Sequence, residues 1–273
     1  MSQQFHFIAG LPRSGSTLFS ALLRQNPDFH ADISSPVMGL VDGVIAQTSA
    51  GTEMAPLVTN QKRMTITKGL FSSYYDDIEK PYIFDTNRGW TSKLSLINAL
   101  YPEAKVICLA RNMAWVLDSM ERQIRKSPLE NTKLFGNSQQ RATVYSRVEA
   151  MAAQSGLVGF AWHALRDGCF SDFADKLLIV DYDLLVRKPA QVMKGVYQFL
   201  ELPEFQHDFD NVEFDSPAFD QNLGIDGLHR VHKQVQPRER KTVLPPELFE
   251  KYSNMMFWRD LKNSDAYTLT PSI

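Results

Sequence analysis

One short segment constrains the fold of this chain more than any other. Residues 10–17 read Gly-Leu-Pro-Arg-Ser-Gly-Ser-Thr. They follow an apolar run that predicts a strand at Phe5–Ala9 and precede a run that predicts a helix at Leu18–Leu23, ending near Asn26 and Pro27. Backbone N–H groups in such a strand-to-helix loop bind phosphates, and the helix N-terminus adds partial positive charge. The segment therefore predicts an α/β fold with an anion site at the end of its first strand.

The rest of the chain continues this alternation of strands and helices. We therefore predict a P-loop-like, mostly parallel sheet with helices on both faces, and added helices in the middle and C-terminal regions. The middle stretch, about Gln139–Phe173, has few helix breakers. This length allows one large domain or two small ones, and we expect residues 1–273 to form a single domain. The further predicted strands are Tyr82–Phe84, Val106–Ala110 and Leu177–Val180, and the further predicted helices are Leu94–Tyr101, Met113–Lys126 and Pro189–Leu200.

Composition excludes several classes of protein. The 273 residues carry 29 Lys plus Arg and 31 Asp plus Glu, a net charge of −2, which argues against a general nucleic-acid binder. Two cysteines, Cys108 and Cys169, cannot make a disulfide framework. No signal segment is apparent, and no run reaches the roughly 18 apolar residues of a membrane span. We therefore expect a cytoplasmic protein without a membrane span.

The loop departs from the nucleotide-triphosphatase pattern in one position. That pattern, G-x-x-x-x-G-K-[ST], places a lysine where this chain has Ser16, and the only cation inside the loop is Arg13. A kinase or ATPase uses the missing lysine on the β- and γ-phosphates, so these activities are disfavoured. Asp85 and Asp181 follow predicted strands and leave only a weak case for magnesium. We expect no metal.

Two charged segments lie near the C-terminal end. Residues 201–220 contain seven acidic side chains and no lysine or arginine. His229–Lys241 contains five basic side chains, among them Arg238, Arg240 and Lys241. Two interpretations of the basic segment stay open at this point. It is either a solvated surface or a loop that closes over an anion.

The segment Leu11–Leu18, followed by Asn26 and Pro27, resembles the 5′-phosphosulfate loop of sulfotransferases. These enzymes use 3′-phosphoadenosine 5′-phosphosulfate (PAPS) as donor and release 3′-phosphoadenosine 5′-phosphate (PAP). A loop with arginine is most similar to the tyrosylprotein and bacterial branches of the family. The resemblance implies that the donor's 5′-phosphosulfate is held by Arg13, Ser14, Gly15, Ser16 and Thr17.

Two later motifs extend the resemblance. Lys105–Arg111 is an apolar strand ending in arginine, and Ser119 follows eight residues later, as in the family's 3′-phosphate site. An arginine at a strand end can grip a phosphate with two N–H donors. The alternative for Arg111 is a surface ion pair with Asp118 or Glu121. The third motif begins at Val180 and resembles a late strand-loop-helix unit of the family, which implies that Tyr182 lies near the nucleotide; a purely structural tyrosine is the alternative.

The implied reaction transfers a sulfuryl group to a hydroxyl or amine by in-line displacement. Its transition state is loose and anionic, so catalysis depends mainly on alignment and cationic stabilisation. The resemblance implies this role for Arg13 and, after the strand at Tyr82–Phe84, for Arg88. The alternative for Arg88 is an ion pair with Asp85. By analogy of position, Arg240 and Lys241 would reach the 3′-phosphate.

The general base and the acceptor are not identified by any motif. Ser34 stands where the tyrosylprotein branch has a glutamate, and Asp32, Asp42 and His30 are weak nearby candidates. The donor and an unknown acceptor are the expected partners, with no nucleic acid, and a homodimer is compatible with the chain. A kinase-like phosphoryl-transfer enzyme and a non-catalytic nucleotide-binding module are the alternative functions.

Overall fold

A computed structural model describes residues 3–126, 129, 134–214 and 231–271 of the chain. Its centre is a six-stranded sheet in the order β2-β3-β1-β4-β5-β6, and every neighbouring pair is parallel. The predicted α/β fold is therefore confirmed, and the described sheet is wholly parallel. The two edge strands contain three residues each, too few to carry a recognisable period. The strands are β1 Gln4–Gly10, β2 Phe29–Ala31, β3 Tyr82–Thr86, β4 Val106–Ala110, β5 Leu177–Asp181 and β6 Tyr267–Leu269.

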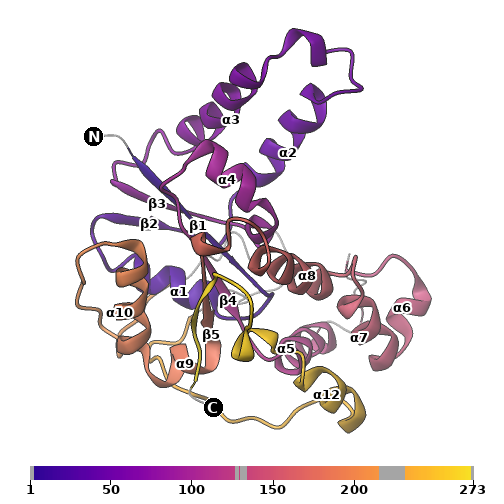
Figure 1. The fold of residues 1–273 in the computed structure, drawn as a ribbon. Coiled ribbons are helices and arrows are strands. Elements are labelled where there is room, and N and C mark those ends of the chain that lie inside the picture. The colour runs from indigo at the N-terminus through magenta and orange to yellow at the C-terminus, as the bar shows by residue number, and fades with distance from the viewer. Residues whose placement is uncertain (1–2, 127–128, 130–133, 215–230, 272–273) are drawn as a thin grey trace.

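Helices cover both faces of the sheet, as predicted (Figure 1). Side chains alternate along each strand, so Phe7 and Ala9 of β1 enter one hydrophobic cluster and Ile8 enters the other. The face of Ile8 is covered by α1 Ser16–Leu23, α9 Tyr182–Arg187 and α10 Pro189–Leu200. The face of Phe7 is covered by α3 Asn60–Tyr74, α4 Leu94–Leu100, α5 Met113–Lys126, α7 Val144–Ala152, α8 Leu157–Cys169 and α12 Pro246–Ser253.

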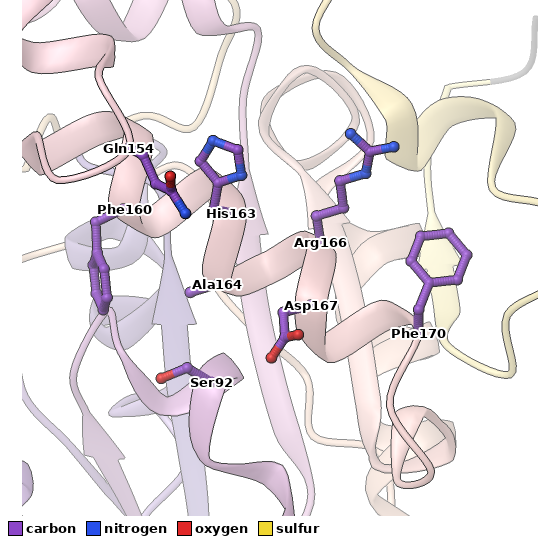
Figure 2. A pocket seen from close by; sticks show the side chains of 8 residues that line it. All are labelled: Ser92, Gln154, Phe160, His163, Ala164, Arg166, Asp167 and Phe170. Carbon is purple, nitrogen blue, oxygen red and sulfur yellow. The ribbon is translucent and has the colours of Figure 1, made fainter.

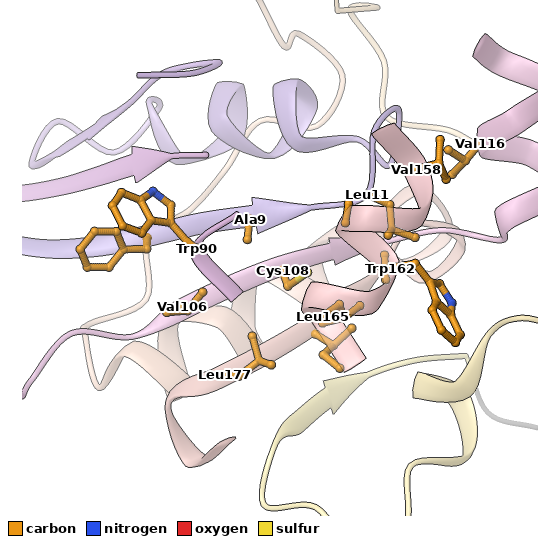
Figure 3. Close-up of a cluster of buried hydrophobic side chains, with 14 of the residues drawn as sticks. Ala9, Leu11, Trp90, Val106, Cys108, Val116, Val158, Trp162, Leu165 and Leu177 are labelled. Atoms are coloured by element: carbon orange, nitrogen blue, oxygen red, sulfur yellow. The ribbon is translucent and has the colours of Figure 1, made fainter. Parts of the chain in front are cut away.

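The larger cluster lies on the Phe7 face, and Figure 3 shows part of it, with Trp90 and Trp162 among its side chains. Trp90 and Trp258 are fully buried, and Phe7 packs against Trp90 with ring centroids 4.8 Å apart. Short 3-10 helices lead into and out of this layer. They are η1 Ala55–Leu57, η2 Trp90–Lys93, η3 Ala174–Lys176 and η4 Phe257–Asp260.

One helical pair was not predicted from the sequence. Helix α2, Val37–Thr48, packs against α3, and the two extend together beyond one side of the sheet (Figure 1). The short helix α6, Ser138–Ala142, precedes α7. Across the described residues, no helix is both long enough and apolar enough to cross a bilayer.

The strand order fixes where a ligand can bind. β1 lies between β3 and β4, so the chain builds the sheet outward from β1 in both directions. In open parallel sheets of this kind, ligands bind outside the carboxyl ends of the strands, where the order reverses. That place is the end of β1, and it carries the loop at residues 11–15.

Candidate active site

The loop at residues 11–15, called here the phosphate loop, turns tightly through two left-handed residues. Arg13 has φ 60° and Gly15 has φ 94°. The backbone of Gly15 lies close to Tyr182, and a Cβ added at Gly15 would stand 2.7 Å from Tyr182 Cδ2. The buried Ser14 hydroxyl donates to the Leu11 carbonyl at 2.6 Å. This buried hydrogen bond therefore stabilises the turn.

The N-terminus of α1 lacks the usual side-chain cap. Its N-cap residue is Gly15, and no acidic side chain lies in its first turn. The half-buried hydroxyls of Ser16 and Thr17 make no hydrogen bond within the described residues. Unpartnered N–H groups and hydroxyls at a helix N-terminus suit an anion.

A second segment ties the phosphate loop to β4 and α5. Arg13 Nε donates to Ser119 Oγ at 3.2 Å, and an Arg111 terminal nitrogen donates to the Arg13 carbonyl at 3.1 Å. The sheet register brings these residues together, since β1 pairs directly with β4. Arg13 therefore contacts two predicted site residues that lie about 100 positions later in the sequence.

Tyr182 completes this contact from the start of α9. The Arg111 guanidinium lies over the Tyr182 ring, 4.1 Å from its centroid, and the same ring approaches Gly15. Such cation–π contacts fix the orientation of a guanidinium plane. Tyr182 is therefore half-buried between the two predicted phosphate sites rather than in the core.

Arg111 is not engaged in the ion pair that the sequence left open. Asp118 pairs with Arg122 and Arg240 instead, and Glu121 pairs with Arg125 and Arg147. The buried Arg111 Nε has no hydrogen-bond partner among residues 3–126, 129, 134–214 and 231–271. A buried unpaired N–H is costly, so this atom fits a site whose partner is a bound anion.

The C-terminal segment docks on α5 through Asp118. This fully buried carboxylate accepts from Arg240 at 2.8 Å, from the Thr242 hydroxyl at 3.0 Å and from the Val243 N–H at 2.7 Å. Burial lowers the pKa of Arg240; Asp118 opposes this effect and the nearby Arg111 cation adds to it. Arg240 therefore lies within electrostatic reach of Arg111.

Lys241 is exposed, and its carbonyl accepts a hydrogen bond from Arg122. Arg238 is also exposed. His229 and Arg230, at the start of the predicted basic segment, lie outside the described residues.

The side of the site next to β3 is built differently. Arg88 follows β3, is exposed, and makes no hydrogen bond or ion pair within the described part of the chain. The predicted alternative, an ion pair between Arg88 and Asp85, is wrong. Asp85 is buried and accepts from Ser35 Oγ at 2.6 Å, Tyr75 Oη at 2.8 Å and Trp90 Nε1 at 2.7 Å. Burial raises the pKa of Asp85, and the three hydrogen bonds oppose that effect.

The weak candidates for a general base have other partners. Asp42 pairs with Lys93 at 2.7 Å. Asp32 is exposed and accepts from the adjacent Ile33 N–H. His30 lies in the middle of β2, where burial lowers its pKa.

The two acidic residues considered for a magnesium site, Asp85 and Asp181, are both engaged by other side chains. Asp85 is occupied as described, and Asp181 accepts from Trp258 and from Arg259 at 2.8 Å. Among the described residues, no group of three or more metal-ligating side chains comes together.

A separate groove of about 590 Å³ lies over the outer side of α8 (Figure 2). No motif predicted it, and none of the predicted donor-site residues lines it. It is polar and aromatic, and its lining residues are Ser92, Gln154, Phe160, His163, Ala164, Arg166, Asp167 and Phe170.

Sequence reasoning missed the buried carboxylates that organise both sides of the site. Asp118 was considered only as an ion-pair partner of Arg111, and its position beside Ser119 was the available signal. Ser35 and Tyr75 carried no signal, because each is an ordinary residue in a segment without a motif.

Comparisons with known proteins bear on the family and the fold of this chain. A sequence model described as the sulfotransferase family matches residues 6–207, well over half of the chain. No significant match exists among curated proteins.

Several solved structures share the fold. A sulfotransferase domain from the curacin biosynthetic pathway is 16% identical, with a TM-score of 0.53, and the match covers 94% of this chain and 92% of that one. A sulfotransferase domain from the Synechococcus PCC 7002 olefin synthase is 18% identical with a TM-score of 0.54, covering 92% and 95%. The mouse sulfotransferase SULT7A1, complexed with PAP, is 13% identical with a TM-score of 0.52, covering 96% and 86%.

Proposed function

Because this chain belongs to the sulfotransferase family, we propose that it transfers a sulfuryl group from PAPS to a hydroxyl or amine of its acceptor. The observation that carries the proposal is the convergence of Arg13, Arg111, Ser119 and Tyr182 beside an uncapped helix N-terminus. In this proposal residues 1–273 act as one sulfotransferase domain. A structural neighbour crystallised with PAP supports the choice of donor.

Two groups of residues would hold the donor. The phosphate loop and the hydroxyls of Ser16 and Thr17 suit the 5′-phosphosulfate, because they offer neutral N–H and O–H donors around a helix N-terminus. Arg111 suits the 3′-phosphate, since its buried Nε lacks a partner and Tyr182 fixes its plane. Ser119 would add a hydroxyl to the 3′-phosphate, and Arg240 and Lys241 would add charge from the docked C-terminal segment.

The reaction itself is an in-line displacement. The acceptor oxygen or nitrogen forms a bond to sulfur while the bond from sulfur to the 5′-phosphate oxygen breaks. Negative charge then grows on the departing phosphate and stays on the sulfuryl oxygens. Arg13 is held beside the loop by its bond to Ser119, and Arg88 after β3 has no ion-pair partner in the described part of the chain, so both are proposed to stabilise that charge.

The phosphoryl-transfer alternative is weaker on chemical grounds. The lysine that would bind β- and γ-phosphates is replaced by Ser16, and the acids at the ends of β3 and β5 are occupied. A non-catalytic nucleotide-binding module is disfavoured because the chain belongs to a family of enzymes, the sulfotransferases.

Thermal denaturation with nucleotides tests the donor. We expect PAP without magnesium to raise the melting temperature, and ATP with magnesium to do so much less. Arg111→Ala should abolish the PAP effect, whereas Arg187→Ala, which removes an exposed cation of α9, should leave it intact. Stabilisation only by ATP with magnesium would contradict the proposal. Release of PAP from PAPS in the presence of alcohols, phenols or amines then separates an enzyme from a binding module.

A further inference from the structure

Asp85 collects donors from three separate segments. Ser35 comes from the loop after β2, Tyr75 from the end of α3 and Trp90 from the start of η2. All three donors are neutral, and no lysine, arginine or histidine of the described chain pairs with Asp85. Other buried aspartates of the molecule, Asp118 and Asp181, are paired with arginine. Asp85 therefore keeps a proton-accepting carboxylate without a cation to suppress its basicity.

Ser35, itself buried, lies beside this carboxylate at the carboxyl end of β3. Its N–H donates to the Thr86 carbonyl at 3.0 Å, which fixes it over the carboxyl end of β3. The next residue of that strand end, Asn87, donates to the Ile8 carbonyl of β1 at 3.0 Å. Ser35 therefore lies above the strand that neighbours β1, whose end carries the phosphate loop.

The Ser35 hydroxyl still has room for one more donor. It donates to Asp85 Oδ2 at 2.6 Å and accepts from the Val37 N–H at 3.2 Å. A serine hydroxyl has one donor and two acceptor lone pairs, so these two bonds leave one lone pair, and the Tyr75 hydroxyl lies within hydrogen-bonding reach of the same oxygen. Nearby, the buried hydroxyl of Thr86 has no partner, which marks a second polar group at this strand end without an internal contact.

We propose that Ser35 and Asp85 form the proton relay that replaces the missing general base. This inference rests on the proposed sulfuryl transfer. Ser35 is the catalytic residue, because its oxygen would touch the acceptor. Asp85 acts through Ser35 as the final proton acceptor.

The relay balances in protons and charge. As the acceptor oxygen bonds to sulfur, its proton passes to Ser35 Oγ, and the Ser35 proton passes to Asp85 Oδ2. Asp85 ends as a neutral carboxylic acid, and the electron pair of the broken S–O bond leaves on the 5′-phosphate of PAP. Proton exchange with solvent through Ser35 restores the carboxylate after the products leave.

The surroundings of Asp85 predict a distinctive pH dependence. The titratable groups that face it are Tyr75 and Tyr74, both on α3, and burial raises the pKa of both tyrosines. Both stay neutral in acid, so an acid limb that is lost in Ser35→Ala and moved in Tyr75→Phe reports Asp85. Because burial raises the pKa of Asp85, the limb should lie above the value of about 3.9 for a free aspartate. The Tyr75 hydrogen bond lowers that pKa, so Tyr75→Phe should move the limb to higher pH.

The experiment measures PAP release from PAPS as a function of pH. The probe acceptors are water, 4-nitrophenol and ethanolamine. The variants compared with the wild type are Ser35→Ala, Ser35→Thr, Asp85→Asn and Tyr75→Phe. A positioned base contributes about 10²- to 10⁴-fold, so we expect Ser35→Ala to lower kcat about 100-fold and to lose the acid limb. Ser35→Thr should recover most of the rate. Tyr75→Phe should keep the rate at high pH and shift the limb upward.

PAP binding by calorimetry is the control for every variant. If PAP still binds but Ser35→Ala keeps the wild-type rate and acid limb, the relay is overturned. If Ser35→Ala and Tyr75→Phe lowered kcat equally and neither moved the acid limb of the rate, the contacts with Asp85 would be structural only. That result would also overturn the relay. If Asp85→Asn does not fold, the comparison of Ser35→Ala with Ser35→Thr still tests the relay. If the wild type binds PAP but releases none from PAPS, the proposed function itself fails.

Discussion

On the β4 side of the phosphate loop the polar groups are arginines and their partners, whereas on the β3 side a buried carboxylate collects neutral donors. Arg111 and Arg240 lie close enough to influence each other, and Asp118 holds Arg240 in place. Asp85, by contrast, accepts hydrogen bonds from the neutral side chains of Ser35, Tyr75 and Trp90. Clustered cations suit a fixed anion such as a 3′-phosphate. A carboxylate without a cation stays basic, which suits proton transfer.

From this difference we propose that one side serves the donor and the other the acceptor, and each side can be tested separately. Variants on the β4 side should change nucleotide affinity. Variants on the β3 side should change turnover and its pH dependence. Arg13 lies between the two, so it should change both.

The largest effect is expected from Arg13→Ala. Loss of a preorganised donor to a developing anion costs about 10²- to 10³-fold in kcat, so turnover should fall by that much even at saturating PAPS. Affinity for PAP should fall too, because Arg13 belongs to the phosphate loop. Steady-state PAP release measures both. The matched control is Arg24→Ala. Arg24 lies at the C-terminal end of α1, and its guanidinium lies over the Phe214 ring. Unchanged turnover at saturation would remove Arg13 from the catalytic role.

The next effect is expected from Arg111→Ala, on affinity alone. A charge-assisted hydrogen bond contributes about 1.5–3 kcal/mol, so PAP should bind about 10- to 100-fold more weakly. Adenosine 5′-phosphate lacks the 3′-phosphate, so its weaker binding should hardly change. Calorimetry with both nucleotides tests this. An equal loss for the two would place Arg111 elsewhere than at the 3′-phosphate.

These two residues could be predicted because each belongs to a contiguous motif next to a strand. The loop after β1 and the Arg111–Ser119 spacing both survive in the one-dimensional sequence, and β1–β4 pairing then brings them together. The central strands and most helices were predictable for a similar reason, since their apolar runs are long. β2 and β6, with three residues each, were not.

The β3 side could not be predicted because no motif connects its members. Ser35, Tyr75, Asp85 and Trp90 come from different segments, and only the sheet and the α2–α3 pair bring them to one point. The same limit applies to the groove over α8, whose lining comes from η2 and α8 together.

A smaller effect is expected from Asp118→Asn, which tests whether the C-terminal segment serves the donor. The change removes the charge that holds Arg240 but keeps the shape of the side chain. We expect about a 5- to 10-fold loss of PAP affinity, the equivalent of about 1 kcal/mol. Proteolysis between residues 231 and 243 should become faster. Asp183 lies on α9 and pairs with Arg259 of η4. Asp183→Asn removes this similar ion pair and should change neither PAP affinity nor the rate of proteolysis. Faster proteolysis with unchanged affinity would separate the segment from the donor site.

The smallest effect on the site is expected from His207→Gln. This variant tests whether acid unfolding, and not Asp85, causes the acid limb of the rate. Burial lowers the pKa of His207 to about 4, below the value near 6.5 expected in the unfolded chain. The unfolded state therefore binds the proton more readily, and stability that is present above pH 6.5 is lost as the pH falls towards 4. Linkage gives a loss of about 1–2 kcal/mol between pH 7 and pH 5 from this residue. Buried His6, with its pKa also lowered to about 4, acts in the same direction.

His207 lies against Tyr197 and Gln25, away from Asp85, so its replacement should flatten the acid loss of stability without changing PAP affinity at pH 7. Urea unfolding at pH 7 and pH 5 measures the first quantity, and calorimetry the second. The acid limb of the rate should then persist in His207→Gln, because it belongs to Asp85 and not to unfolding. If the limb disappeared together with the stability change, acid unfolding would explain it, and the β3 side would lose its assignment to proton transfer.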